Sequence, residues 1–452
     1  MIGTGYVGLV SGACFSEFGV EVACVDQDRE KIARLNDGAM PIWEPGLDEL
    51  VAKNRAAGRL GFTTDLKTAV AGADAVFIAV GTPARRGDGH ADLSYVFAAA
   101  AEVAAALASS SEGEGPTIVV TKSTVPVGTG RRVGEVLAQH LPASRFAVAS
   151  NPEFLREGSA IGDFMRPDRV VIGTDSEAAR EVLRRLYRPL YLLETPIVFT
   201  SLESAELIKY AANAFLAAKI GFINEIADLC EAVGADVQDV AHGIGLDGRI
   251  GRKFLHAGPG FGGSCFPKDC RALVRSAEEA GAPLSLVGAV LEANDARKER
   301  MAERIRTICG GAAGDIGGQR LAALGLTFKP NTDDMRDSPA LAILPALAAA
   351  GAHIRATDPQ GVVEARKLMP DLQYCADPYE ALDGADALIL LTEWNAFRAL
   401  DLARVKTLLR RPLVIDLRNV YQPAEMLAAG LHYHSIGRPP AIPAGPRLRA
   451  IA

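Results

Sequence analysis

Short aliphatic runs alternate with amphipathic or alanine-rich helical stretches over residues 1–200 of this chain. The runs read VEVACVD, ADAVFIAVGTP, PTIVVTKST, RFAVASNPEF, RVVIGT and PIVFT. Strands that are apolar throughout and are separated by helices are typical of a parallel sheet with helices on both faces. The alternation therefore predicts a doubly wound α/β domain.

The rest of the chain predicts a helical middle and a second α/β region. From Ser204 to about Val233 the apolar side chains recur on one helical face, and a helix of that length suggests a connector between domains. Beyond Arg320 the strand-like runs LAALGLTF, ADALILLTEW and PLVIDLRN return, with helical stretches between them. Because 452 residues exceed the usual size of one domain, several cores are expected. We expect three parts, at residues 1–200, 201–310 and 311–452.

Composition narrows the possible functions. The formal net charge of -7 gives no long-range attraction to nucleic acid or to an anionic membrane, so local cations must hold any anionic ligand. No run of about 18 apolar residues could span a bilayer, and the first residues lack the basic region of a signal peptide. Seven irregularly spaced cysteines without a CxxC pair favour a reducing cytoplasm, and the dispersed histidines predict no metal site.

The chain opens on a glycine pattern of Gly3, Gly5 and Gly8, and the strand EVACVD ends in Asp26, 18 residues after the last glycine. Glycines that open a helix let the backbone approach a pyrophosphate, and the helix N-terminus favours the anion. An acid at the end of the next strand binds ribose hydroxyls and repels a 2′-phosphate, so the pattern predicts NAD rather than NADP. The alternative is a glycine-rich turn in an ordinary βα unit.

Only Met1 and Ile2 precede these glycines, whereas a central parallel strand needs about five or six residues. A sheet that lacks most of its central strand would leave the two neighbouring strands unpaired. We therefore hypothesise that the natural start lies a few codons upstream, and a native protein whose intact mass begins at Met1 would contradict this.

A second glycine-rich segment, RIGRKFLHAGPGFGGSCFPKDC, delivers a thiol at Cys265 and an acid four residues later at Asp269. Glycines beside a cysteine suggest close approach of a substrate to the backbone. A thiol can capture an aldehyde as a thiohemiacetal, which is then oxidised to a thioester and hydrolysed. A small buried packing residue is the alternative for any single cysteine, but the glycine-rich context favours a nucleophile.

Seven segments, in order over nearly the whole chain, resemble the motifs of the UDP-glucose/GDP-mannose dehydrogenase family: GTGYVGL, VGTP, KSTVPVGT, NPEFLREG, AELIKYAANAF, GFGGSCFPKD and LTFKPNTDDMRDSP. The resemblance implies two Rossmann-like doubly wound domains, for NAD and for the UDP-sugar, joined by a long central helix and a helical, dimerising middle domain. It also implies a homodimer or larger homo-oligomer that uses two NAD per nucleotide sugar. The last two segments look most like the UDP-glucose branch, for which the product would be UDP-glucuronate.

The resemblance assigns catalytic roles to six residues: Cys265, Lys209, Asn213, Asp269, Glu153 and Thr124. Cys265 matches the nucleophile, and the lysine and asparagine of KYAAN, one helical turn apart, match groups that stabilise an oxyanion. Asp269 resembles a residue that orders a catalytic water, and Glu153 resembles the base for thioester hydrolysis, with Thr124 helping to hold the water. Two alternatives stay open: Lys209 could be a surface lysine on a helix, and Glu153 could be an acid in the first turn of a helix.

The resemblance also implies two sets of binding residues. The cofactor set is Gly3, Gly5, Tyr6, Val7, Gly8, Asp26, Lys31, Thr82, Thr124, Glu157 and Lys268. The substrate set is Glu153, Phe154, Leu155, Glu157, Lys209, Asn213, Arg249, Phe254, Gly260, Gly262, Lys329 and Arg418. Within these sets Lys31 could instead be a solvated helix charge, and Arg249 resembles an arginine that reaches the site of a neighbouring subunit.

Three competing functions follow from the same residues. The nearest is the same four-electron oxidation of another nucleotide sugar, such as UDP-N-acetylmannosamine or GDP-mannose, because pocket shape sets sugar selectivity. A two-electron dehydrogenase would need neither Cys265 nor a second α/β domain. A non-catalytic protein that only binds NAD or a nucleotide sugar should have lost the thiol, the lysine or the asparagine, and all three are present.

Overall fold

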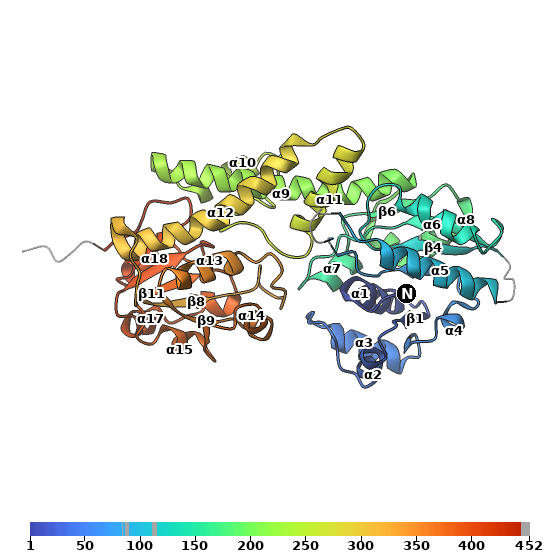
Figure 1. The fold of residues 1–452 in the computed structure, drawn as a ribbon, viewed down its shortest axis with the longest axis horizontal. Helices are drawn as coiled ribbons and strands as arrows, with labels where there is room; N and C mark the ends of the chain where they lie inside the picture. The colour runs from blue at the N-terminus through green and yellow to red at the C-terminus, as the bar shows by residue number, and fades with distance from the viewer. Residues whose placement is uncertain (84, 86–89, 111–114, 444–452) are drawn as a thin grey trace, which may run out of the picture. The chain divides into compact units, whose positions relative to one another are not determined.

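The structure, a computed structural model, describes residues 1–83, 85, 90–110 and 115–443 and divides into two compact units. The first unit comprises Met1–Ala212 and Arg271–Pro283, and the second comprises Asn213–Cys270 and Leu284–Ala452. Each unit contains a sheet with helices on both faces (Figure 1). In the part of the chain that the structure describes, no helix is both long and apolar enough to cross a membrane.

The sheet of the first unit has the order β2-β1, then the single residue Ile2, then β3-β4-β5-β6-β7. Neighbouring strands are parallel except β5 and β6, which meet antiparallel at Ser150 and Gly173. The strands are β1 (Val22–Val25), β2 (Leu60–Thr63), β3 (Ala75–Ile78), β4 (Thr117–Thr121), β5 (Phe146–Ser150), β6 (Val170–Gly173) and β7 (Ile197–Thr200). All six strand-like runs of the first 200 residues are thus confirmed as strands, and β2 is an addition.

Ile2 occupies the central position of this sheet. It bridges to Val25 on one side and to Ile78 on the other, and its side chain is buried. Its N–H donates to the carbonyl of Phe77 at 2.7 Å, and its carbonyl accepts from the N–H of Ala79 at 2.8 Å. Both neighbouring strands therefore pair at this residue, which gives the strand order of a dinucleotide-binding fold.

Helices cover both faces of the first sheet. They are α1 (Tyr6–Glu17), α2 (Arg29–Asn36), α3 (Leu47–Ala56), α4 (Leu66–Val70), α5 (Ser94–Ala108), α6 (Thr129–Ala138), α7 (Ala160–Met165), α8 (Glu177–Leu186) and the 3-10 helix η1 (Arg188–Leu193). Along β4, Ile118 and Val120 enter one buried cluster with α1 and α7, and Val119 enters the other with α5 and α6. Burial on both faces explains why these strands are apolar throughout.

The second unit contains an all-parallel sheet in the order β10-β9-β8-β11-β12-β13. Its strands are β8 (Arg320–Leu324), β9 (His353–Thr357), β10 (Gln373–Tyr374), β11 (Ala387–Leu390), β12 (Leu413–Asp416) and β13 (His432–Ser435). The order matches that of the first sheet, so the expected pair of Rossmann-like domains is confirmed.

The helices of the second unit are α10 (Val237–Gly245), α12 (Ser285–Gly310), η2 (Gly311–Ala313), α13 (Pro339–Ala349), α14 (Val362–Leu368), α15 (Pro378–Leu382), α16 (Asn395–Arg398), α17 (Leu402–Leu408) and α18 (Pro423–Ala428). Two further helices, α9 (Leu202–Val233) and α11 (Phe266–Glu279), run through both units. The predicted long helix is confirmed and begins two residues earlier than expected.

Candidate active site

The first glycine turn leaves a helix N-terminus open. Helix α1 begins directly after Gly5, and no described side chain caps it. A Cβ at Gly3 or Gly8 would meet backbone oxygens at 2.6 and 2.0 Å, whereas at Gly5 it would meet no described atom within 4 Å. The turn itself therefore requires the first and third glycines, and the second leaves space for a ligand. Open N–H groups at a helix N-terminus suit a pyrophosphate.

Asp26 lies directly after β1. Its carboxylate accepts hydrogen bonds from the N–H of Thr4 at 2.9 Å, from the Thr4 hydroxyl at 2.6 Å and from Lys31 Nζ at 2.9 Å. Burial disfavours the charge, but these bonds outweigh it and lower the pKa of Asp26 to about 2. An ionised carboxylate at this place suits ribose hydroxyls and repels a 2′-phosphate. Lys31 forms an ion pair with Asp26, so its ammonium has a specific partner, unlike a helix charge that only contacts solvent.

Two further members of the predicted cofactor set follow Gly5. Val7 is half-buried in the first turn of α1, and the hydroxyl of Tyr6 donates to the buried carboxylate of Glu44. Glu44 also accepts from the N–H groups of Gly158 at 2.6 Å and Ala160 at 2.7 Å. The Tyr6 side chain therefore ties α1 to the start of α7, and its backbone N–H is the group that faces the open helix N-terminus.

The loops after β3 and β4 meet through two threonines. The Thr82 hydroxyl donates to the carbonyl of Thr124 at 3.0 Å, and the Ser123 hydroxyl donates to the carbonyl of Val80 at 2.7 Å. Thr82 is buried, and Thr124 is half-buried. Because both loops follow the carboxyl ends of parallel strands, they lie at the edge where such sheets bind dinucleotides.

Glu153 and Lys209 form a buried ion pair in the first unit. Lys209 Nζ lies 3.0 Å from Glu153 Oε1, and the side chains are 4% and 6% exposed. The second carboxylate oxygen accepts from the N–H of Leu155, and Lys209 Nζ lies over the Phe154 ring at 5.3 Å. Four predicted residues are thus together at the end of β5. The half-buried Glu157 follows them in the same loop.

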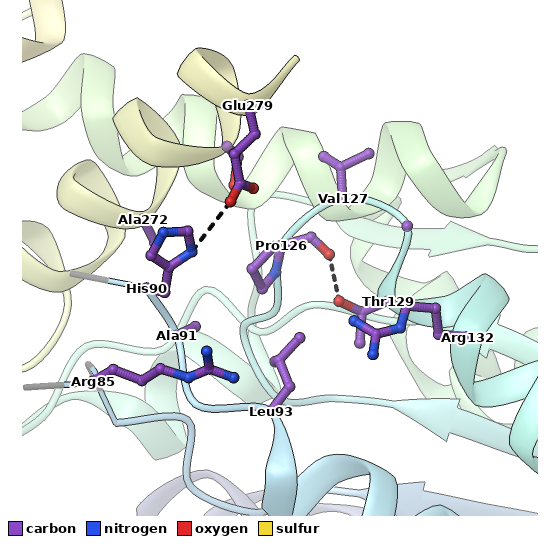
Figure 2. Close-up of a pocket in the computed structure, with 12 residues that line it drawn as sticks. Arg85, His90, Ala91, Leu93, Pro126, Val127, Thr129, Arg132, Ala272 and Glu279 are labelled. Atoms are coloured by element: carbon purple, nitrogen blue, oxygen red, sulfur yellow. Dashed lines mark hydrogen bonds and ion pairs between the residues drawn. The ribbon is translucent and has the colours of Figure 1, made fainter. Parts of the chain in front are cut away.

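A cavity of about 300 Å³ lies in the first unit, beside the segments that follow Thr82 and Thr124 (Figure 2). Arg85 and Arg132 line it, as do Pro126 and Thr129, and so do His90 and Glu279, whose Nδ1 and Oε1 atoms lie 3.5 Å apart. Within the described residues, its lining shares no member with the predicted cofactor and substrate sets. The cavity therefore adjoins the predicted site and does not coincide with it.

Cys265 stands directly before α11, and its carbonyl accepts from the N–H of Asp269 at 2.8 Å. Its Sγ lies 3.5 Å from the Ser264 hydroxyl. Of the seven cysteines, all of which are among the described residues, six are buried and Cys265 is partly exposed. The positive end of a helix dipole stabilises a negative charge, so this position suits a thiolate.

Polar partners surround the acid that follows the thiol. Asn213 Nδ2 donates to Asp269 Oδ2 at 2.7 Å, and Lys268 Nζ donates to Asp269 Oδ1 at 2.7 Å. Asp269 and Asn213 are buried. These three predicted residues therefore form one chain of contacts in the second unit, next in sequence to the thiol. Helix α9 carries both Asn213 and Lys209, four residues apart, as expected.

The glycines before Cys265 are packed against other backbone. A Cβ at Gly262 would lie 2.3 Å from the carbonyl oxygen of Asp337, and one at Gly263 would lie 2.7 Å from the Phe328 ring. A Cβ at Gly260 would lie 3.0 Å from Asn294 Oδ1. Tight packing within the second unit therefore already requires Gly262 and Gly263, whatever a substrate adds.

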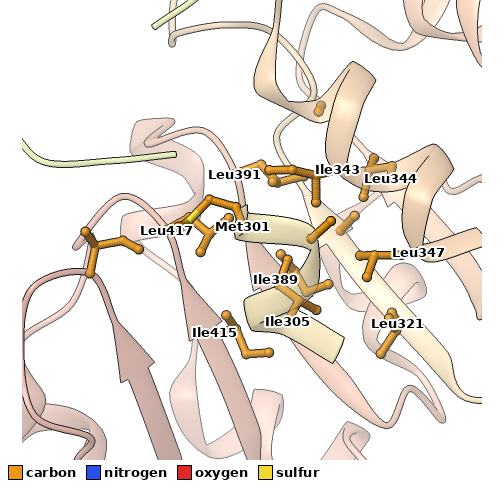
Figure 3. Close-up of a cluster of buried hydrophobic side chains, with 14 of the residues drawn as sticks. Met301, Ile305, Leu321, Ile343, Leu344, Leu347, Ile389, Leu391, Ile415 and Leu417 are labelled. Atoms are coloured by element: carbon orange, nitrogen blue, oxygen red, sulfur yellow. The ribbon is translucent and has the colours of Figure 1, made fainter. Parts of the chain in front are cut away.

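Asn294 fixes this loop from α12. Its side-chain amide accepts from the Phe261 N–H at 2.7 Å and donates to the Phe261 carbonyl at 3.1 Å. The helix itself is anchored by Met301 and Ile305, which pack among the buried side chains of the second sheet (Figure 3). The loop that presents the thiol is therefore held by a well-packed element.

The remaining predicted substrate residues are spread over the second unit. Arg418 donates to the carbonyls of Leu391 and Phe328 at 2.8 Å, and Lys329 Nζ lies 5.3 Å from the Phe328 ring. The Phe254 ring lies 6.0 Å from that of Phe266, next to the thiol in sequence. The Arg249 side chain is 90% exposed and pairs with Asp247 at 2.6 Å.

Comparison with known proteins identifies the family. Models of the NAD binding domain, the central domain and the UDP binding domain of the UDP-glucose/GDP-mannose dehydrogenase family match residues 1–191, 203–296 and 322–423. The chain belongs to the UDP-glucose/GDP-mannose dehydrogenase family. The resemblance seen in the seven motifs is thereby confirmed.

Relatives agree over nearly the whole chain of this family member. It is 61% identical to the UDP-glucose 6-dehydrogenase of Rhizobium meliloti, over 97% of this chain and 99% of that protein. It is 50% identical to the UDP-glucose 6-dehydrogenase TuaD of Bacillus subtilis, over 97% of this chain and 93% of that protein. A UDP-glucose dehydrogenase structure from Pyrobaculum islandicum superimposes with a TM-score of 0.85 at 40% identity, covering 93% of each chain.

The first unit contains two groups of the kind that bind parts of NAD. The open helix N-terminus at Gly5 and the ionised Asp26 fit a pyrophosphate and a ribose, respectively. Glu44, Lys122 and Asn294 are among the buried polar residues that the sequence did not predict. Lys122 lies in the KST motif, which gave a local signal. The partners of Glu44 and Asn294 are backbone groups and, for Glu44, also the Tyr6 hydroxyl, all distant in sequence.

Proposed function

We propose that this chain is an NAD-dependent UDP-glucose 6-dehydrogenase that oxidises UDP-glucose to UDP-glucuronate through a covalent intermediate on Cys265. The observation that carries the proposal is the placement of Cys265 at the N-terminus of α11, beside the contact chain of Lys268, Asp269 and Asn213. The 61% identity to a protein named UDP-glucose 6-dehydrogenase supports the choice of sugar.

The residues near Gly5 and Asp26 would hold NAD, which, when bound, takes up the two electrons and the hydrogen of each oxidation. The helix N-terminus would bind the pyrophosphate, and the Asp26 carboxylate would accept hydrogen bonds from ribose hydroxyls. Thr82, Thr124, Glu157 and Lys268 complete the proposed cofactor set. Two oxidations per sugar require two NAD in turn.

The first oxidation converts the primary alcohol of the sugar to an aldehyde. The Cys265 thiolate then adds to the aldehyde carbon and forms a thiohemiacetal, whose oxyanion needs a positive or hydrogen-bonding partner. Lys209 and Asn213 would supply that partner. The second oxidation converts the thiohemiacetal to a thioester that stays on Cys265.

Hydrolysis of the thioester releases the product. Water attacks the thioester carbon, and one of its protons passes to Glu153. The carbon–sulfur bond then breaks to leave the Cys265 thiolate and a carboxylic acid, which gives its proton to solvent and becomes the carboxylate product. Asp269 and Thr124 would position the water. The buried Glu153 beside Lys209 is consistent with this role, because a base has to be held within reach of a defined water.

Recognition of the nucleotide sugar would fall to the substrate set. Lys329 supplies a cation for the diphosphate, and Phe154, Leu155, Phe254, Gly260 and Gly262 contribute to the sugar pocket. Arg418 donates hydrogen bonds to two backbone carbonyls, one of them next to Lys329. It would therefore hold the Lys329 loop in addition to binding the ligand. Small differences in such a pocket select one sugar over another.

The proposal is tested by supplying NAD with UDP-glucose, UDP-galactose, GDP-mannose or UDP-N-acetylmannosamine and measuring the NADH formed per sugar consumed. We expect turnover with UDP-glucose and two NADH per sugar. One NADH per sugar would contradict the four-electron scheme. Preferred turnover of GDP-mannose or UDP-N-acetylmannosamine would mean that the substrate is that nucleotide sugar, oxidised by the same reaction. No turnover of any of these sugars would indicate a binding protein.

We also propose that the chain works as a homodimer or a larger homo-oligomer in the cytoplasm. Phe215, Phe222 and Leu229 recur every seven residues on α9 and are 68%, 52% and 56% exposed. A stripe of this kind on a long helix favours a second copy as its partner. The seven cysteines, all in described residues, are thiols, as suits a reducing compartment.

A further inference from the structure

Lys122 is a buried lysine of the first unit that the proposed reaction does not use. It directly follows β4, and the residue is 3% exposed. Its Nζ donates to Asn151 Oδ1 at 3.0 Å and to the Tyr187 hydroxyl at 3.2 Å. The rings of Phe164 and Tyr187 lie 5.7 and 5.9 Å from the same nitrogen. Among the described residues, every hydrogen-bond partner of this ammonium is therefore a neutral group.

This arrangement costs stability. A buried ammonium loses its hydration, and neutral partners return only part of that free energy. Burial lowers the pKa of Lys122 to about 8, the negative charge of Glu153 raises it, and the positive charge of Lys209 lowers it. Lys122 is accordingly charged at neutral pH. A side chain of similar length without a charge, such as methionine, would fill the same space at lower cost.

The ammonium lies next to the turn that carries the proposed base. Asn151, its partner, is two residues before Glu153, and the Asn151 side-chain amide also donates to the carbonyl of Val171 at 2.8 Å. The Tyr187 hydroxyl donates to the same Asn151 oxygen at 2.6 Å. The turn between β5 and Glu153 is thus fixed by a network with Lys122 at its centre, and Lys122 is close enough to Glu153 and Lys209 for their charges to act on it.

We propose that Lys122 is a positioning residue for thioester hydrolysis: it holds the Asn151–Glu153 turn, and its buried charge stabilises the Glu153 carboxylate while Lys209 stabilises the oxyanion. This inference rests on the proposed function. During hydrolysis Lys209 is drawn toward the new negative charge, so Glu153 needs a second cation nearby to stay in place. In a buried site of low dielectric constant, a positive charge has a larger effect on a nearby carboxylate than it has in water.

The test is the variant Lys122→Met in the full chain. We expect kcat to fall about tenfold or more, with KM for UDP-glucose and for NAD changed by less than about threefold. Because hydride transfer would continue while hydrolysis slows, intact-mass measurement should show a UDP-glucuronyl adduct on Cys265. The melting temperature should equal or exceed that of the wild type, because the buried charge is gone. If Lys122 had only a structural role, the variant would melt at a lower temperature and would not accumulate the adduct.

A control is Tyr187→Phe, which removes two hydrogen bonds of the network, the one to Asn151 and the one from Lys122, but keeps the ammonium charge and both rings. Its hydrolysis rate should stay within about twofold of the wild type. Lys122→Gln, which keeps a donor for Asn151 and lacks the charge, serves if the methionine variant does not fold, and it should accumulate the same adduct. Wild-type hydrolysis in a folded, uncharged variant overturns the inference. Failure of the wild type to form two NADH per UDP-glucose overturns the proposed function instead.

Discussion

Cys265 is partly exposed at a helix N-terminus, and this position distinguishes the proposed nucleophile from the other six cysteines of the chain, which are buried. Replacement by serine keeps the size of the side chain and removes the readily ionised thiol. We expect Cys265→Ser to reduce turnover by on the order of 1,000-fold or more, or to trap an adduct, while UDP-glucose binding changes little. Mass spectrometry with substrate and calorimetric binding measure the two effects. Unaltered turnover would eliminate the covalent mechanism.

Asp26 and Lys31 make a second residue-scale prediction, about the choice of cofactor. Since hydrogen bonds hold the pKa of Asp26 at about 2, its charge does not change above pH 4, and KM for NAD should show no titration of this group between pH 5 and 8. Asp26→Asn removes the negative charge and leaves Lys31 beside the ribose position. We expect the ratio of kcat/KM for NADP to that for NAD to rise about tenfold or more.

The control for this cofactor prediction is the KM for UDP-glucose, measured in the same variant. KM for UDP-glucose in Asp26→Asn should stay close to the wild-type value, because Asp26 lies in the first unit at the end of β1 and Lys329 lies in the second. An unchanged preference for NAD would mean that Asp26 has only a structural role, as the partner of Thr4.

At the scale of elements, a buried carboxylate caps α6 from another helix. Glu206 of α9 accepts from the N–H of Gly128 and of Gly130, each at 2.7 Å, at a helix start that has no side-chain cap of its own. Burial raises the pKa of Glu206 to about 7, although these two hydrogen bonds act in the opposite direction. The folded protein thus binds this proton more tightly than the unfolded chain between about pH 4.5 and 7.

The sign of the pH effect follows from this raised pKa. The stability that Glu206 contributes is complete below about pH 4.5 and declines as the pH rises to 7, since the unfolded chain gives up the proton first. Glu206→Gln cannot titrate and places an amide N–H against a backbone donor, so it should lower the free energy of unfolding by about 1–3 kcal/mol at pH 5. The difference from the wild type should be smaller at pH 8.

This prediction is measured in a Trp394→Phe background. The chain has two tryptophans, Trp43 in the first unit and Trp394 in the second, so Trp43 fluorescence then follows the unit that contains α6. Urea unfolding of both chains at pH 5 and pH 8 gives the two differences in free energy. A difference that is equal at both pH values would mean that Glu206 is ionised throughout.

The elements that the sequence predicted share one property, burial on both faces. The runs that form β3, β4, β6, β11 and β12 are apolar except at the ends of β4 and β12, because helices cover both sides of their sheets. Three strands lack such a run. Residues alternate between buried and exposed in β2, β10 has only two residues, and β13 is polar. Pattern reasoning therefore found the centres of both sheets and missed strands toward their edges.

The candidate site was predictable where a side chain carries the chemistry and not where it binds distant backbone. Asp26, Glu153, Lys209 and Cys265 were found from motifs. Glu44 binds the N–H groups of residues more than 100 positions away, and no local spacing signals such a contact. The glycines near Cys265 were read as room for substrate, yet the Cβ positions of two of them are already occupied by backbone and a ring of the same unit.

At the scale of the whole molecule, the exposed apolar stripe on α9 predicts an assembly. Phe215, Phe222 and Leu229 are separated by seven residues each, so they lie along one side of the helix, and leaving them in water costs roughly 1.5–3 kcal/mol for each side chain. A second copy of the chain offers the same stripe, and two such stripes suit a twofold interface. The exposed Arg249 on the same unit is the group that would reach the partner's site.

Phe222→Glu places a charge in the middle of the stripe and should convert the assembly to monomers, because burying an unpaired carboxylate would oppose association. Light scattering after size exclusion should then give 47.6 kDa, in place of about 95 kDa or more for the wild type. Tyr191→Glu, at another exposed aromatic residue, is the matched control and should leave the assembly intact. If Arg249 acts across the interface, the monomer should lose its UDP-glucose oxidation while it still binds NAD, since the proposed cofactor residues other than Lys268 lie within the first unit. A fully active monomer would mean that Arg249 does not act on the partner's site.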